Sequence, residues 1–85
     1  MSIWTESKHN SWIDNEGKYR LTIISRGNWY LNVDNARTNT RIVQVYLGLP
    51  NEAMAREYMA NLLFVNQDSD FLVVNLKKTV ESYRR

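Results

Sequence analysis

The side chains best suited to binding a ligand lie between residues 18 and 46, and most are guanidinium groups, carboxamides and phenol rings. An arginine offers a planar fork of donors that matches phosphate oxygens or a guanine edge, and a carboxamide both donates and accepts, as an adenine edge requires. Such a set is typical of surfaces that contact nucleic acids. The predicted binding residues are Arg20, Arg26, Tyr30, Asn32, Arg37, Arg41, Gln44 and Tyr46.

The residue types that most catalysis needs are scarce. The chain has no cysteine and one histidine, His9, which excludes disulfides, thiolate or histidine-clustered metal sites, and Ser-His or Cys-His triads. Glu52 and Glu57 are five residues apart on a predicted helix and do not face each other, so they are not an acid and base pair. We therefore expect no enzymatic activity, catalytic residue, metal, cofactor or small-molecule substrate.

Alternation of apolar and polar residues predicts three strands. Residues 18–26 and 29–33 alternate on either side of the tight connector Arg26-Gly27-Asn28, so they form a hairpin, and residues 41–47 repeat the pattern. The predicted binding residues of these strands then share one side of the sheet. The other side carries the inward residues Leu21, Ile23, Trp29, Leu31, Val33, Val43, Val45 and Leu47.

One helix is predicted from Asn51 to Val65. Pro50 interrupts the preceding strand, Asn51 can cap the helix, and Glu52 lies in the first turn, where the helix dipole favours a carboxylate. An apolar stripe at helical spacing lets this helix lie on the sheet. The fold class is thus predicted as α+β, a three-stranded antiparallel sheet packed on one face by a single helix, with an extra strand or arm at each end.

The N-terminal segment, residues 1–17, is expected to be an arm or a strand. It ends in the turn Asp14-Asn15-Glu16-Gly17, which contains a glycine able to adopt positive φ. Trp4 and Trp12 could cover either an edge or a groove of the sheet, and the sequence leaves this open.

The C-terminal segment, residues 66–85, is expected to be a strand or arm, because Phe71–Leu76 is a short apolar run. The spacing of Leu76, Val80 and Tyr83 leaves a short helix as the alternative. With residues 18–65 forming the three strands and the helix, residues 1–85 make a single domain.

The distribution of charge along the chain is more informative about a binding surface than the net charge is. Lys and Arg number 11 and Asp and Glu number 9, a net charge of +2. Residues 18–41 carry five cations against Asp34 alone, whereas residues 42–70 carry Arg56 against four carboxylates, so the sheet is basic and the helix acidic. The basic C-terminus is read as a solvated tail or as an arm that follows phosphates, and comprises Lys77, Lys78, Arg84 and Arg85.

No membrane partner is expected. The longest apolar runs, Leu62–Val65 and Phe71–Val74, are four residues each, against the ~20 that a membrane-spanning helix needs. The first residues lack the basic and apolar regions of a signal peptide, so a cytoplasmic protein is expected.

A family pattern is visible over about residues 19–76. Its elements are Tyr19-Arg20, Arg26-Gly27-Asn28-Trp29, Val33, Arg41, Tyr46-Leu47-Gly48, then Ala53, Ala55 and Tyr58. The pattern resembles the plant Apetala-two or ethylene-response-factor DNA-binding domain, and its relatives at the N-termini of tyrosine integrases and in phage homing endonucleases.

The resemblance implies that the sheet faces a DNA groove through Arg20, Arg26, Tyr30, Asn32, Gln44 and Tyr46. This chain departs from the family in two strands. The first strand has Leu21, Thr22 and Ile24 where the family is richer in arginine, and the third has Gln44 and Tyr46 where the family presents arginine and tryptophan.

Two functions follow from the bare sheet face. The first is a small protein that binds duplex DNA, of the kind that phages and mobile elements use as regulators. The second is a non-enzymatic protein-binding or inhibitor module that uses the same face or an edge strand on a protein partner, since Tyr and Arg are enriched in interface hot spots. Self-association through an edge strand is a third, and the oligomeric state is left open.

Overall fold

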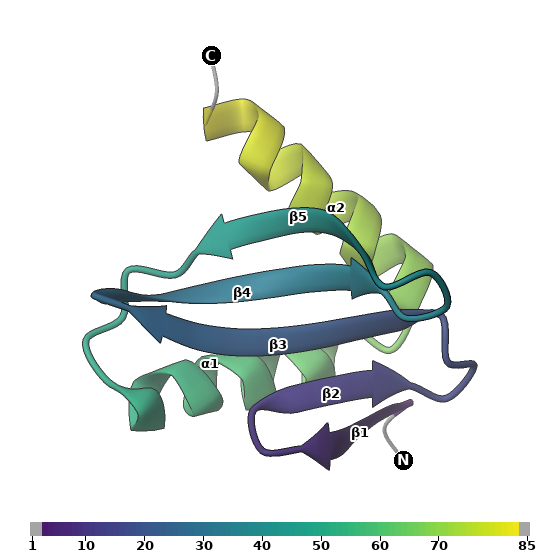
Figure 1. Cartoon of the computed structure of the whole chain (residues 1–85), viewed down its shortest axis with the longest axis horizontal. Helices are drawn as coiled ribbons and strands as arrows, with labels where there is room; N and C mark the ends of the chain where they lie inside the picture. The colour runs from purple at the N-terminus through teal and green to yellow at the C-terminus, as the bar shows by residue number, and fades with distance from the viewer. Residues whose placement is uncertain (1–2, 84–85) are drawn as a thin grey trace.

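A computed structural model describes residues 3–83 of the chain as an α+β domain with a five-stranded antiparallel sheet and two helices. The strands follow one another across the sheet in chain order, so each pairs with its neighbour in sequence (Figure 1). The elements are β1 (Trp4–Lys8), β2 (Ser11–Asp14), β3 (Tyr19–Arg26), β4 (Asn28–Asn35), β5 (Thr40–Tyr46), α1 (Glu52–Val65) and α2 (Ser69–Tyr83).

The three predicted strands form the centre of the sheet. β3 and β4 pair along their full length, and Gly27 between them has φ +78°, a left-handed conformation that glycine adopts without strain. The register aligns Leu21, Val33 and Val43 in one row and Ile23, Leu31 and Val45 in the next, all on one side of the sheet. The predicted hairpin and third strand are confirmed.

α1 begins where the sequence predicts. Oδ1 of Asn51 accepts a 2.9 Å hydrogen bond from the backbone nitrogen of Met54, which satisfies one of the free N–H groups at the helix start. Ala55, Met59 and Leu63, at spacings of four, are buried against the sheet. The helix itself runs from Glu52 to Val65.

The C-terminal segment is a second helix, so the prediction of a strand or arm is wrong. Oδ1 of Asp68 accepts a 3.0 Å hydrogen bond from the backbone nitrogen of Phe71 and thereby starts α2. Leu72, Val73 and Leu76 are buried and form one helical stripe, which a four-residue apolar run cannot distinguish from a strand. Arg84 and Arg85 of the predicted basic tail lie outside the described residues.

The N-terminal segment forms two strands rather than one strand or arm, so the sheet has five strands and not three. β1 and β2 make a hairpin whose turn contains Asn10 at φ 63°, a conformation that asparagine tolerates. Trp4 and Trp12 are 6% and 9% exposed, and the indole nitrogen of Trp4 donates a 3.1 Å hydrogen bond to the carbonyl oxygen of Asn66. The two tryptophans are therefore core residues that extend the apolar side of the sheet.

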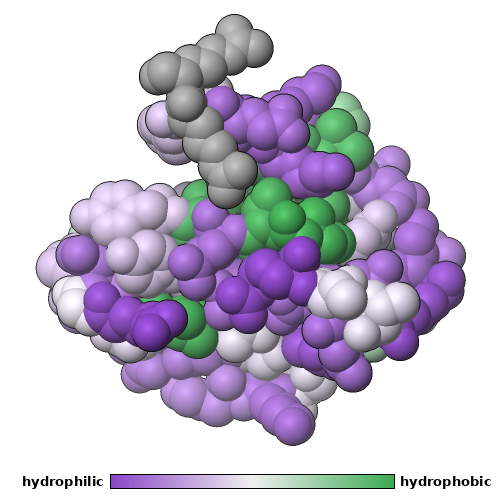
Figure 2. Space-filling view, turned by 45° about the horizontal axis from the view of Figure 1, so that its top comes forward, coloured by the Kyte–Doolittle hydropathy of each residue, from purple (hydrophilic) through white to green (hydrophobic). Residues whose placement is uncertain are grey.

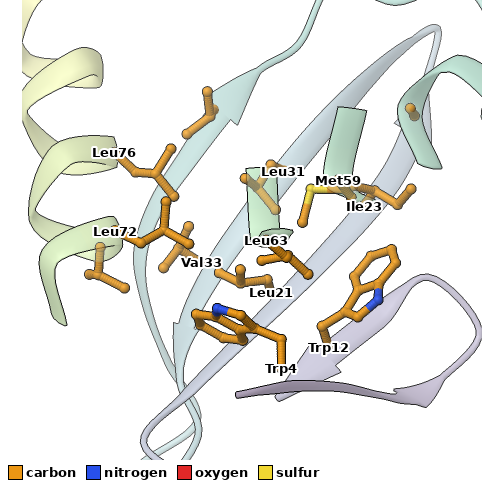
Figure 3. Close-up of a cluster of buried hydrophobic side chains, with 13 residues drawn as sticks. Trp4, Trp12, Leu21, Ile23, Leu31, Val33, Met59, Leu63, Leu72 and Leu76 are labelled. Atoms are coloured by element: carbon orange, nitrogen blue, oxygen red, sulfur yellow. The ribbon is translucent and has the colours of Figure 1, made fainter. Parts of the chain in front are cut away.

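Both helices pack on the same side of the sheet. Side chains from all five strands and both helices meet in one buried cluster, in which Leu21, Leu31 and Met59 are fully enclosed (Figure 3). Figure 1 views the sheet from the other side, with α1 behind β3 and α2 passing behind β5. Two helices rather than one thus cover one face, and neither covers the opposite face.

Candidate nucleic-acid interface

Three cross-strand rows of side chains occupy the uncovered side of β3, β4 and β5, and together they are called the open face here. The strand register brings one residue of each strand into each row. The rows are Arg20, Asp34 and Arg41, then Thr22, Asn32 and Gln44, and finally Ile24, Tyr30 and Tyr46. Figure 2, which looks obliquely across β5, shows mainly hydrophilic and intermediate colours over the sheet, with an apolar strip towards α2.

The middle row is held by a hydrogen bond between two carboxamides. Nε2 of Gln44 donates to Oδ1 of Asn32 at 2.7 Å. Asn32 is only 6% exposed, because its neighbours in the row cover it, whereas Gln44 is exposed. The prediction of Asn32 as a contact residue therefore needs correction, since Asn32 orients Gln44 and Gln44 presents its amide to solvent.

The aromatic row pairs Tyr30 with Tyr46. Their ring centroids are 5.6 Å apart with the planes at 62°, an edge-to-face arrangement. Tyr46 is 58% exposed and Tyr30 is half-buried. Gly48 lies beside this pair. A Cβ at position 48 would come within 3.2 Å of Cε2 of Tyr46, and the φ of +66° at Gly48 also disfavours other residues. The glycine thus makes room for the exposed ring.

The charged row contains an acid that the sequence did not assign to the site. Nε of Arg41 lies 2.7 Å from Oδ1 of Asp34, and the Asp34 side chain is 16% exposed. Arg20 donates from one guanidinium nitrogen to Oδ1 of Asn39 at 3.2 Å, which fixes its direction along the face. The row therefore has a cation at each end and a carboxylate between them.

Arg26 and Arg37 lie away from the rows. Arg26 ends β3 and is exposed. Arg37 lies in the turn after β4, where its guanidinium donates to the carbonyl oxygen of Glu16 at 3.4 Å. The structure therefore brings Arg20, Arg41, Tyr30, Asn32, Gln44 and Tyr46 onto one face, leaves Arg26 at its end, and places Arg37 in the neighbouring turn.

Carboxylates on the covered side are engaged with partners from other elements. Glu6 receives two hydrogen bonds from Arg56, at 2.7 and 3.0 Å. The bonding to Arg56 is the main reason that the pKa of Glu6 falls to about 2, with the backbone hydrogen bond from Asn10 second. These contacts join β1 to α1.

Asp70 and Glu52 repeat this arrangement. Lys18 lies 2.7 Å from Oδ2 of Asp70 and Tyr19 donates to Oδ1 at 2.7 Å, and both bonds lower the pKa of Asp70, that of Lys18 more. The pKa of Glu52 is lowered mainly by the side-chain hydrogen bond from Asn10. His9 is exposed as predicted, and it also contacts Glu52 at 3.2 Å. Carboxylates of both helices thus bond to side chains of the sheet and its turns.

The site continues beyond the predicted residues onto the N-terminal hairpin. Ser11 lies opposite Thr22 and Ile13 opposite Arg20, which extends two rows onto β2. A hollow of about 530 Å³ opens there, lined by Ser7, Lys8, His9, Ser11, Ile13, Arg20 and Thr22. No apolar–polar alternation marks this extension in the sequence, because Trp12 and Ile13 are adjacent apolar residues.

Within residues 3–83, no three His, Asp or Glu side chains are grouped so as to hold a metal ion. Neither described helix has the length and apolar character needed to cross a membrane. No protein-family model, curated protein or solved structure was found to match the chain.

Proposed function

We propose that this protein binds duplex DNA through the open face of its sheet. The observation that carries the proposal is the small number of carboxylates among the cations of the open face. Among the described residues, Lys8, Arg20 and Arg26 make no ion pair, and Arg41 shares the face with a single carboxylate, Asp34. Phosphate contacts supply most of the affinity of a DNA-binding surface, and they require cations that internal carboxylates leave available.

The groups along the centre of the face suit contact with bases. Gln44 is exposed, and its amide can bond to an adenine edge in the major groove. The phenol of Tyr46 adds a donor and a flat ring next to it. Cations at both ends of the charged row, Arg20 and Arg41, then fall where phosphates flank the bases.

The width of the three central strands, β3 to β5, is compatible with this orientation. Neighbouring strands are about 4.8 Å apart, so β3 and β5 lie roughly 10 Å from each other. The major groove is ~12 Å wide and admits secondary-structure elements of this size. We therefore place β4 towards the groove floor and β3 and β5 towards its walls.

The test is a binding titration of a labelled 15-base-pair duplex over a series of salt concentrations. Arg20→Gln and Arg41→Gln are each expected to weaken binding and to reduce the slope of log affinity against log salt by about 1. Lys77→Gln, which removes an equal charge from the exposed side of α2, is the matched control and should leave the slope unchanged. An unaltered slope in both face variants, or no duplex affinity at low salt, would overturn the proposal.

A second candidate, a protein partner, is favoured by the exposed apolar side chains on either side of the connection between α1 and α2. Phe64 is 81% exposed, Val65 75% and Phe71 61%. Large exposed apolar side chains are enriched at protein interfaces. A complex through these residues would survive moderate salt, whereas one dominated by phosphate contacts would weaken by orders of magnitude.

A further inference from the structure

The hollow at the junction of the open face and the N-terminal hairpin has the lining of an anion site. Its walls come from the end of β1, the turn after it, β2 and β3. The volume of about 530 Å³ lies within the ~300–1,000 Å³ of small-molecule sites. None of the seven lining residues is Asp or Glu. Whatever enters meets cations, hydroxyls and the side chain of Ile13.

Two of the lining residues bring positive charge and make no ion pair with any of residues 3–83. Lys8 is exposed and makes no ion pair with any of residues 3–83. Arg20 uses one guanidinium nitrogen on the neutral Asn39, which leaves other N–H groups of its fork for a ligand. His9 contacts Glu52 through Nε2, so its ring is bonded to α1 and is not included in the proposed site.

Two hydroxyls offer a further donor. Oγ of Ser11 and Oγ1 of Thr22 are 3.0 Å apart, so one hydroxyl hydrogen is used between them. The other hydroxyl hydrogen is not needed for that bond and can be donated to a ligand oxygen. A tetrahedral oxyanion with several acceptor oxygens matches an ammonium, a guanidinium and a hydroxyl better than a monovalent halide does.

We propose that this hollow binds a phosphate group through Lys8, Arg20 and the Ser11–Thr22 hydroxyl pair. The identification of that phosphate as part of a duplex backbone rests on the proposed function, whereas the site itself rests on its lining. A backbone phosphate held here would fix the position of the open face along the duplex. A phosphorylated small molecule is the other source of the same chemistry.

The test has two arms that use the full chain. In the first, inorganic phosphate is titrated at constant ionic strength, with chloride as the reference, while backbone amide signals are followed by NMR. Saturable shifts are expected at Lys8, Ser11 and Thr22. The double variant Lys8→Gln with Arg20→Gln should bind phosphate at least about tenfold more weakly. Lys77→Gln, which removes a cation from the exposed side of α2, outside the hollow, is the control and should bind phosphate as the unmodified protein does.

The second arm repeats the duplex titration with the same variants. A salt slope lower in the double variant than in Arg20→Gln alone identifies the bound phosphate as one of the duplex backbone. Saturable phosphate binding without any duplex affinity would support the hollow as a site for a free phosphorylated ligand and would remove the proposed function.

Two results would contradict the phosphate site. Shifts that never saturate, or phosphate binding that weakens equally in Lys77→Gln, would mean an adventitious ion only and would overturn the phosphate site. The protein could also bind the duplex with a salt slope that Lys8→Gln leaves unchanged, and show no saturable phosphate binding. That result would overturn the phosphate site and leave the proposed function intact.

Discussion

Nε2 of Gln44 lies 2.7 Å from Oδ1 of Asn32, and this bond links the exposed residue at the middle of the open face to a buried one. Asn32 lies directly opposite both Gln44 and Thr22 in the register. The bond therefore connects the stability of the sheet with the orientation of the amide that we place against the bases.

Replacement of Gln44 alone is expected to cost stability. Gln44→Ala leaves the buried oxygen of Asn32 without its partner, which should reduce the free energy of unfolding by about 1–3 kcal/mol. The double variant Asn32→Val with Gln44→Val removes both polar groups and should recover most of that loss. Urea unfolding of the three proteins measures the difference, and a double variant less stable than Gln44→Ala would contradict the explanation.

Asp34 is expected to weaken DNA binding in the natural protein. Asp34→Asn removes the carboxylate of the charged row and frees Arg41 from its ion pair. Duplex affinity at low salt should rise by about three- to fivefold, and the salt slope should become steeper by about 1. Glu57→Gln, an equal charge change on the exposed side of α1, is the control. Unchanged or lower affinity in Asp34→Asn would argue against contact between this row and phosphates.

α2 should contribute to the core through one stripe only. Leu72 is 2% exposed, so Leu72→Ala is expected to lower the free energy of unfolding by about 2–5 kcal/mol. Val74, two residues further along, is 47% exposed. Val74→Ala should therefore change the free energy of unfolding by less than about 0.5 kcal/mol. Thermal or urea unfolding distinguishes the two. Equal losses would mean that the helix is rotated or that the segment is not helical.

Loss of the N-terminal cap of α1 is expected to lower the free energy of unfolding by less than the loss of a core side chain does. Asn51→Ala removes the acceptor for the backbone nitrogen of Met54 and should cost about 1 kcal/mol. Asn61→Ala, on the exposed side of the same helix, should be neutral or stabilising by a few tenths of a kcal/mol, because alanine has the higher helix propensity. The two unfolding midpoints should shift in opposite directions or differ clearly in size.

Acid stability should depend on Glu6. Its pKa is lowered in the folded protein from 4.5 to about 2, so the carboxylate stabilises the fold above pH 4.5. That contribution is lost as the pH falls through about 2, because the unfolded chain takes up the proton first. Glu6→Gln should therefore show a smaller drop in melting temperature across this range. Glu81→Gln, on the exposed side of α2, should keep the original pH profile, and identical profiles for both variants would refute the role of Glu6.

The central strands could be predicted because apolar and polar residues alternate over most of their length. The positions of Leu21, Ile23 and Leu31 indicate which side of the sheet is buried. Gly27 marks the turn between β3 and β4. The segment Phe71–Leu76 gave the wrong element, because a short apolar run fits a strand and a helix equally well. Only its continuation to Val80 and the capping residue Asp68 indicate a helix.

The candidate site was predicted only in outline. Alternation identified the side on which Arg20, Tyr30 and Gln44 lie. It could not show the pairing of Asp34 with Arg41 or the burial of Asn32, because both depend on which residues of different strands lie opposite each other. The first turn, at Asn10, has no glycine or proline to mark it, so the N-terminal hairpin and the hollow beside it were missed.

The order of the strands has a consequence for synthesis. Every β pairing joins consecutive segments, so contact order within the sheet is low and each hairpin can close as soon as it leaves the ribosome. The apolar layer of that sheet is nevertheless completed only by residues 52–83, which are translated after all five strands. A nascent chain that ends before α1 would expose Leu21, Leu31 and Val33 to solvent and to chaperones until α1 and α2 follow.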